Sequence, residues 1–202
     1  RNPLRTWLLV GCAGLVLGLA MGIRQVQGLF MLPMLESTGW SRGVFSFAFG
    51  LQVLVWGVVQ PVTGMLADRF GTRFVIAGGC LLYGLGLFVQ ATAQSSSVMV
   101  TGAGVMTGVA LTATTFSTVY AGLARLFPVE RRGWAQGVAG AIGGFMQFVL
   151  VPLSQAGISS IGWSATLQAF GALVIACIVA ALYIDDRRAP HSGDARPAGR
   201  VA

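Results

Sequence analysis

Residues 64–73 read GMLADRFGTR, and this stretch decides how the chain folds. It holds three charged side chains, whereas the segments on either side, 42–67 and 73–93, consist almost wholly of apolar and small residues. Each segment reaches the roughly 20 residues that a helix needs to cross the hydrocarbon core of a bilayer. The stretch therefore predicts a short polar turn between two transmembrane helices.

The glycines and the charges of this turn have separate expected roles. Gly71 permits a tight reversal of the backbone, and Gly64 permits the close approach of another helix. Asp68 ends its helix where a carboxylate opposes the helix dipole, so we expect it to require a cation or the N-terminus of another helix. Arg69 and Arg73 can bind carboxylates or lipid phosphates. The alternative is an ordinary basic turn of a membrane protein without a role in gating.

The composition of the whole chain extends this interpretation. Hydrophobic residues make up 55% of the 202 residues and charged residues only 9%, against about a quarter in a soluble domain. We therefore predict an all-α polytopic membrane protein with one bundle at residues 1–184. Its six transmembrane helices are expected at 6–35, 42–67, 73–93, 97–126, 132–159 and 162–184. The polar residues 185–202 are predicted to form a cytoplasmic linker or tail.

The positions of the arginines predict the orientation. Nearly all of the thirteen basic residues fall at the N-terminus, after the sixth helix or in the two loops on the same side, whereas Arg42 falls on the opposite side. Because cytoplasmic loops carry the excess of basic residues, both termini are predicted to be cytoplasmic, in a cytoplasmic (inner) membrane. Each triplet of helices has a short outer loop poor in basic residues, as an inverted three-plus-three repeat would give.

Other function classes lack the residues that they need. The net charge of +7 comes from arginines in short clusters, without the continuous basic face of a nucleic-acid-binding protein. Cys12, Cys80 and Cys177 lie in apolar segments and His191 lies in the polar tail, so neither a metal site nor a cofactor is indicated. No serine–histidine pair or carboxylate pair falls at membrane depth, so an enzyme with catalytic residues is not expected.

Arg24 is the strongest candidate for a binding residue. It lies within the first predicted helix, where a central arginine costs about 2.5–3.5 kcal/mol on insertion scales. A residue retained at such a cost is expected to face an aqueous cavity, and its planar guanidinium suits a carboxylate substrate. The alternative is an arginine whose charged end reaches the membrane surface, or one that ties helices together.

Four further residues are candidates for the same substrate site. Gln27 follows Arg24 at i+3 and shares its helix face. Gln52 and Trp56 lie four residues apart on the second helix, where amides facing lipid would be unfavourable, so they line either a cavity or a helix contact. Tyr120 belongs to a hydroxyl-rich fourth helix whose threonines are mainly expected to bond their own backbone, and its phenol can serve a carboxylate.

The stretch at residues 64–73 resembles the G-x-L-a-D-r-x-G-x-r signature that the major facilitator superfamily carries between its second and third helices. The resemblance covers the whole chain. Three further stretches resemble the oxalate/formate antiporter and monocarboxylate transporter branch of that family: 22–25, 39–42 and 125–133. In one departure, a fourth-helix arginine found in many proton-coupled members falls at Gly104 here.

The resemblance implies the N-terminal half of a twelve-helix secondary transporter that moves a small organic anion by alternating access, as a symporter or an antiporter. In the family the aspartate of the signature, Asp68 here, docks on a helix of the second half and locks the outward-open state. The implied partners are a small anionic solute, the lipid bilayer and a second six-helix half. Two alternatives remain: a half-size transporter that acts as a homodimer, and a membrane subunit that does not transport.

Overall fold

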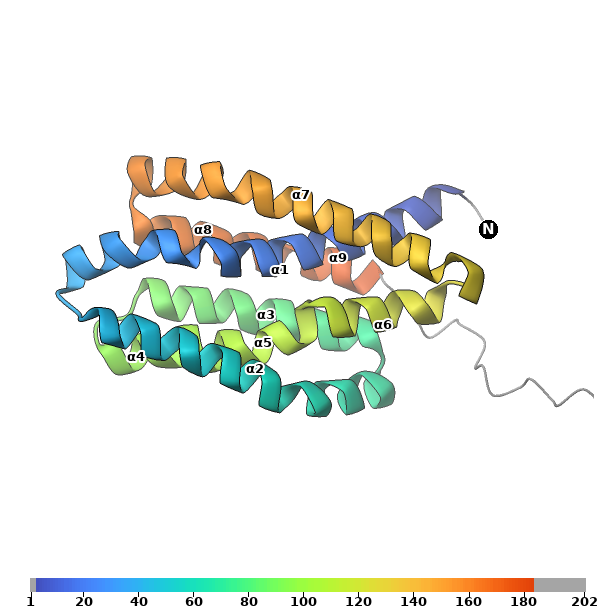
Figure 1. Ribbon diagram of the computed structural model, residues 1–202, viewed down its shortest axis with the longest axis horizontal. Coiled ribbons are helices and arrows are strands. Elements are labelled where there is room, and N and C mark those ends of the chain that lie inside the picture. The colour runs from blue at the N-terminus through green and yellow to red at the C-terminus, as the bar shows by residue number, and fades with distance from the viewer. Residues whose placement is uncertain (1–2, 184–202) are drawn as a thin grey trace, which may run out of the picture.

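The computed structural model describes residues 3–183, and within them every regular element is a helix (Figure 1). The elements in chain order are α1 (Pro3–Thr38), α2 (Arg42–Phe70), α3 (Thr72–Ala91), α4 (Ser96–Val100), the π-helix η1 (Thr101–Met106), α5 (Thr107–Thr114), α6 (Phe116–Leu126), α7 (Val129–Ile161), α8 (Trp163–Ala176) and α9 (Ile178–Tyr183). The predicted tail at 185–202, which includes His191, lies outside the described residues.

Six stretches of this helical chain are long and apolar enough to cross a membrane. They are Thr6–Thr38, Arg42–Phe70, Thr72–Ala91, Ser96–Leu126, Val129–Ile161 and Trp163–Tyr183. The fourth span combines α4, η1, α5 and α6, and the sixth combines α8 and α9. The prediction of an all-α, multi-pass membrane protein with six transmembrane helices is confirmed.

Glycines close the shortest connections between these helices. Gly71 alone separates α2 from α3, and Gly162 alone separates α7 from α8. Their φ angles are +93° and +85°, in the left-handed region that side chains rarely adopt. Gly39, at φ +71°, begins the connection from α1 to α2. These abrupt reversals return each span along the preceding one, as Figure 1 shows.

The packing of the spans has the symmetry of an inverted repeat. The first span packs along the fifth (α1 on α7), the second along the fourth (α2 on η1 and α5), and the third along the sixth (α3 on α8 and α9). An inverted repeat exchanges the first span with the fourth, the second with the fifth and the third with the sixth. Under this exchange the first–fifth pair becomes the fourth–second pair, and the third–sixth pair is unchanged. The symmetry is incomplete, because α3 also packs extensively on the fourth span, whereas the sixth span contacts α1 less. The bundle thus follows the predicted three-plus-three plan.

Small residues bring α1 and α7 together. Gly14, Gly18 and Gly22 lie about one turn apart on α1, and a Cβ on any of them would come within 2.4–2.7 Å of a side chain of α7. The two helices therefore approach more closely than larger residues would allow, as is common between membrane helices. This contact fixes α1 against α7 along the buried part of its length.

The fourth span departs from the continuous helix predicted at 97–126. It contains the π-helix η1, and at Thr115 the backbone becomes extended (φ −106°, ψ −172°) between α5 and α6. Side chains that bond the backbone compete with the helical hydrogen bonds, which explains the break. The threonine hydroxyls around it donate to backbone carbonyls: Thr114 to Ala110 (3.0 Å), Thr115 to Leu111 (2.6 Å) and Thr118 to Thr112 across the break (2.7 Å).

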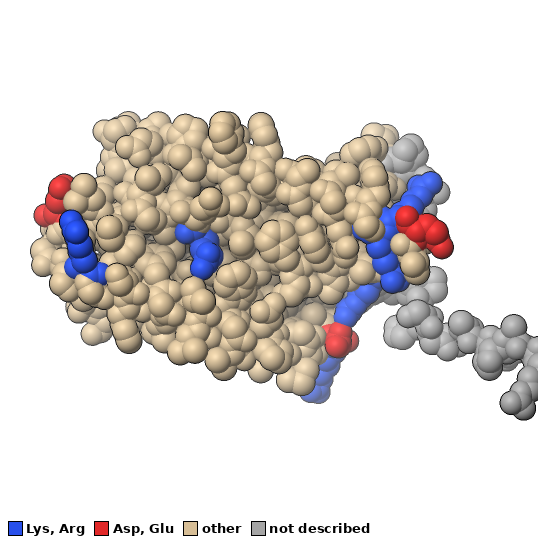
Figure 2. All heavy atoms as spheres, viewed as in Figure 1, with Lys and Arg blue, Asp and Glu red and all other residues tan. Residues whose placement is uncertain are grey.

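Apolar side chains cover the outside of the bundle, and charges gather at its two ends (Figure 2). Phe148 of α7 and Val58 of α2, for example, are 76% and 68% exposed. Apolar surface on this scale belongs in contact with lipid tails rather than water. Figure 2 also shows one basic patch midway along the bundle, and Arg24 is the one charged residue between residues 6 and 183 that lies far from the end of a span.

Candidate functional site

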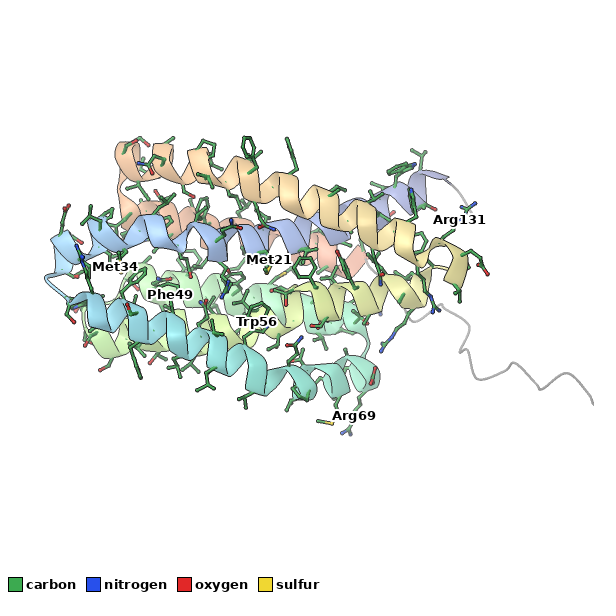
Figure 3. All side chains as sticks on the ribbon, in the orientation of Figure 1. Met21, Met34, Phe49, Trp56, Arg69 and Arg131 are labelled. Carbon is green, nitrogen blue, oxygen red and sulfur yellow. The ribbon has the colours of Figure 1, made fainter. Side chains whose placement is uncertain are left out.

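Arg24 lies near the middle of the first span and contacts α2. Its Cζ is 5.1 Å from the centroid of the Trp56 ring, so the guanidinium and the indole form a cation–π contact between the two helices. The side chain is half-buried, and its Nε is shielded from solvent without a hydrogen-bond partner among the described residues. Figure 3 shows Trp56 midway along the bundle, away from Arg69 and Arg131 at one end. The charge therefore sits at the depth where a bilayer is least polar.

Two fully buried glutamines extend the site from Arg24. Gln52 donates from Nε2 to the backbone carbonyl of Ala103 at 2.8 Å and to Oε1 of Gln27 at 3.5 Å. Helical spacing brings these residues together, because Gln27 follows Arg24 by three residues on α1 and Gln52 precedes Trp56 by four on α2. The structure thus pairs four of the five predicted substrate-site residues between α1 and α2, Arg24 with Trp56 and Gln27 with Gln52. We call Arg24, Gln27, Gln52 and Trp56 the Arg24 group.

Close packing between α2 and the fourth span holds Gln52 beside Ala103. A Cβ at Gly104 would come within 3.0 Å of the Ala48 carbonyl, and one at Gly108 would come within 2.9 Å of the Gln52 carbonyl. The two glycines therefore let the backbones approach. The same contact explains why position 104, an arginine in many proton-coupled members of the resembled family, leaves little space for a side chain here.

Four polar atoms of the Arg24 group are buried without hydrogen-bond partners in the described part of the chain: Arg24 Nε, Gln27 Nε2, Trp56 Nε1 and Gln52 Oε1. Leaving one such atom unpaired costs on the order of 1–3 kcal/mol, and folded proteins seldom leave several together. Three of the four are donors, and the guanidinium adds a positive charge. Chemically, such a set of groups can pair with a partner that accepts hydrogen bonds and carries negative charge.

Tyr120, the fifth candidate, is directed toward α7. Its ring makes an edge contact with Phe116 (5.4 Å between centroids), and its backbone carbonyl accepts from Gln136 Nε2 at 3.2 Å. The phenol oxygen lies against Gly140, where a Cβ would be only 2.6 Å away. None of these contacts connects Tyr120 to Arg24.

The turn at 64–73 has a partner within the chain. Asp68, at the end of α2, forms an ion pair with Arg125, at the end of α6. Arg125 also donates from Nη1 to the Ala67 carbonyl and to Thr72 Oγ1, each at 3.3 Å. The cation that we expect Asp68 to require is therefore supplied by the fourth span. Because the Asp68 side chain is 71% exposed, the pair stabilises the fold by at most about 1 kcal/mol.

The two arginines of the turn contact aromatic rings, and one glycine faces open space. Cζ of Arg69 is 5.4 Å from the centroid of Phe70, and Cζ of Arg73 is 4.5 Å from that of Phe74. At Gly64 a Cβ would meet no atom within 4 Å. The helix that we expect to approach Gly64 is therefore not among those that the structure describes.

Sequence reasoning did not identify two participants in these arrangements. Ala103 contributes a backbone carbonyl, for which its side chain gives no signal. Arg125 had a detectable signal, because it ends a predicted helix on the same side of the membrane as Asp68. Residues 3–183 contain no cluster of three His, Cys, Asp or Glu side chains suited to a metal ion.

Six apolar spans in two exchangeable triplets, with Arg24 and two buried glutamines at mid-depth, define a polytopic membrane protein built as an inverted repeat. Comparison with known proteins identifies the family. The model of the Major Facilitator Superfamily matches residues 10–201, and the chain belongs to this family. The predicted family is thereby confirmed.

Three relatives indicate the branch to which the chain is similar. It is 29% identical over 169 residues to monocarboxylate transporter 11 of Mus musculus and 26% identical over 171 residues to monocarboxylate transporter 3 of Rattus norvegicus. It is 31% identical over 165 residues to probable anion transporter 2, chloroplastic, of Oryza sativa subsp. japonica. These matches cover 84%, 85% and 74% of this chain but 37%, 34% and 28% of the relatives. The chain thus spans about a third of the length of the relatives that it matches.

Proposed function

We propose that this chain is one six-helix half of a secondary active transporter that carries a small organic anion, such as a carboxylate, across the cytoplasmic membrane by alternating access. The observation that carries the proposal is the Arg24 group, where Arg24 Nε and two further donors lie shielded at mid-depth without hydrogen-bond partners among the described residues. The relatives whose names specify monocarboxylates or anions support the same class of solute.

The proposed recognition of an anion follows from the electrostatics of a half-buried cation at mid-depth. Attraction between opposite charges grows as the surrounding dielectric constant falls, so a carboxylate beside Arg24 would gain more energy than it would in water. The cation–π contact with Trp56 uses the face of the indole ring and none of the guanidinium N–H groups as hydrogen-bond donors. The N–H groups of Arg24 can therefore donate to a carboxylate. Gln27 and Trp56 would add neutral donors to the second carboxylate oxygen.

The Asp68–Arg125 pair is the proposed gate, together with Gly64, Arg69, Gly71 and Arg73. It ties the end of α2 to the end of α6, on the side where the predicted orientation places the cytoplasm. The extended backbone at Thr115 separates α6 from α5, so α6 can tilt while α5 stays packed on α2 and α3. In this proposal the ion pair opens and closes with that movement.

A second six-helix body is proposed to complete the transport unit, either the other half of a longer chain or a second copy of this one. α2 and α7, which the inverted repeat exchanges, are the two least buried spans. Each carries exposed glycines at which a Cβ would meet no atom within 4 Å, namely Gly50, Gly57 and Gly64 on α2 and Gly133, Gly137 and Gly144 on α7. Glycine faces of this kind suit close packing against other helices.

Counterflow in proteoliposomes tests the proposal. The full-length protein, preloaded with an unlabelled carboxylate, should accumulate the labelled form, and Arg24→Ala should reduce the rate by at least about tenfold. Arg42→Ala, which removes an exposed arginine at the start of α2, is the matched control and should leave the rate unchanged. Equal uptake by Arg24→Ala of every anion that the wild type accepts would contradict the binding role. A folded wild type that exchanges no anion would favour a membrane subunit that does not transport.

A further inference from the structure

Gln52 differs from the rest of the Arg24 group because its buried atom without a hydrogen-bond partner is an acceptor. The Ala103 carbonyl can only accept a hydrogen bond, so the amide atom 2.8 Å from it must be the nitrogen of Gln52. The oxygen, Oε1, is thereby identified as the buried atom without a partner. Gln27 is oriented in turn, because its oxygen faces the Gln52 nitrogen and its own nitrogen is left open.

The π-helix η1 makes the Ala103 carbonyl available to Gln52. In an α-helix the N–H of Thr107 would donate to this carbonyl, four residues earlier. Here the Thr107 N–H donates instead to the carbonyl of Gly102, and the Thr107 hydroxyl bonds the same oxygen at 2.8 Å. The shift of one residue releases the Ala103 carbonyl from its usual partner. Short π-helices recur at functional sites, and this one orients a side chain of the Arg24 group.

The four open atoms together describe a ligand with two kinds of group. Arg24 Nε, Gln27 Nε2 and Trp56 Nε1 need acceptors, which a carboxylate provides. Gln52 Oε1 needs a donor, which a carboxylate lacks. A single ligand that satisfies all four therefore carries an N–H or O–H group in addition to its carboxylate.

We propose that the Arg24 group selects an organic anion with a hydrogen-bond donor beside its carboxylate, such as a 2-hydroxy acid, over the 2-oxo acid of the same carbon skeleton. The carboxylate accepts from Arg24, Gln27 and Trp56, and the hydroxyl donates to Gln52 Oε1. A 2-oxo acid presents only an acceptor at that position, so Gln52 Oε1 stays unpaired beside another oxygen. The inference rests on the proposed function, because it takes the Arg24 group as the substrate site.

Binding of matched acids to the purified full-length protein tests the selection. The probes are lactate, pyruvate and propionate, followed by the four-carbon and five-carbon sets with the same substituents. In at least one set the hydroxy acid should bind about tenfold more tightly than the oxo acid, as expected for one hydrogen bond to a buried acceptor. Equal affinities of the hydroxy and oxo acids in every set would overturn the inference.

Variants of Gln52 locate the preference. Gln52→Leu should bring the hydroxy/oxo ratio to within about twofold while the unsubstituted acid still binds. Gln155→Leu, an exposed glutamine on α7, is the matched control and should keep the wild-type ratio. If Gln52→Leu kept the wild-type preference for the hydroxy acid, the assignment of that preference to Gln52 would be overturned. If this variant does not fold, the hydroxy/oxo affinity ratios of the wild type decide whether the selection exists.

The two proposals fail in different ways. If the three acids bind equally in every set, and all lose affinity in Arg24→Ala, the anion site is supported and the selection for a hydrogen-bond donor is contradicted. Equal binding of the acids would also be the result if a bound water donates to Gln52 Oε1, because water would satisfy that atom with any ligand. If no acid of any set binds to the folded protein, the proposed function falls and the donor selection falls with it.

Discussion

The guanidinium of Arg24 lies over the indole of Trp56, with Cζ 5.1 Å from the ring centroid, and this contact joins α1 to α2 at mid-length. The two helices share few other contacts, because α1 packs mainly on α7 and α2 mainly on the fourth span. The Arg24 group therefore lies where the two helix pairs exchanged by the inverted repeat meet. A solute bound there would touch both pairs, as alternating access around a midplane site requires.

Trp56 is expected to contribute to anion affinity through Arg24. A cation–π contact is worth about 0.5–2 kcal/mol, so Trp56→Leu should weaken carboxylate binding about 2- to 30-fold, and Trp56→Phe should weaken it less. Dissociation constants from equilibrium binding would measure the change. Trp134→Leu, which removes a ring that contacts Trp7 near the start of α7, serves as the control. An equal loss in both leucine variants would contradict a specific role for Trp56.

Asp68 and Arg125 are expected to act on the rate of transport and to have little effect on stability. Asp68→Asn and Arg125→Gln should each change the maximal rate of counterflow with KM nearly unchanged, and lower the free energy of unfolding by less than about 1 kcal/mol. The double variant should transport no more slowly than the more impaired single variant, because both substitutions remove the same ion pair. Fully additive losses would show that the two residues act separately. Glu36→Gln, at the opposite end of the bundle, is the control.

Gly18 is expected to be essential for the contact between α1 and α7. A Cβ at this position would lie 2.7 Å from Met146 Cβ and 3.0 Å from Gly143 Cα, and neither atom can move without a shift of α7. Gly18→Val should therefore cost about 1–3 kcal/mol of folding free energy. Thermal melting of the detergent-solubilised protein measures this loss. Gly11→Val, on the same helix with no atom within 4 Å of a Cβ, should melt close to the wild type.

The helices could be predicted from the sequence because their signals are local. Apolar length, the arginines between the segments and the glycines at the turns all act within a few residues of the structure that they determine. The break at Thr115 could not be predicted from such local signals. It depends on several threonine hydroxyls that bond backbone carbonyls together, and each of them is also compatible with a continuous helix.

The candidate site was predictable where polar side chains interrupt apolar helices. Arg24, Gln27, Gln52 and Trp56 stand out for that reason, and helical spacing places them on two faces that then meet. The partner of Gln52 was not predictable, because Ala103 contributes a backbone carbonyl released by a change of helix type. The Asp68–Arg125 pair depends on how α2 packs against α6, which periodicity does not determine.

The exposed glycines of α2 are expected to contact the second six-helix body. Gly57→Phe should reduce counterflow strongly while the thermal melting of the bundle changes little, because no atom lies within 4 Å of a Cβ at that position. Val58→Phe is the matched control, because Val58 is the next residue along α2, is 68% exposed and is expected to face lipid. Unchanged counterflow in Gly57→Phe would contradict a packing role for this face.

Equilibrium binding of a labelled carboxylate to the purified full-length protein tests the anion site most directly. Loss of one partner of a buried charge pair costs about 2–5 kcal/mol, so Arg24→Ala should bind at least about 30-fold more weakly than the wild type. Arg24→Lys should retain intermediate affinity, because it keeps the charge but loses the planar fork of donors. Arg42→Ala should bind as the wild type does. An Arg24→Ala protein that binds every carboxylate with wild-type affinity would contradict the account.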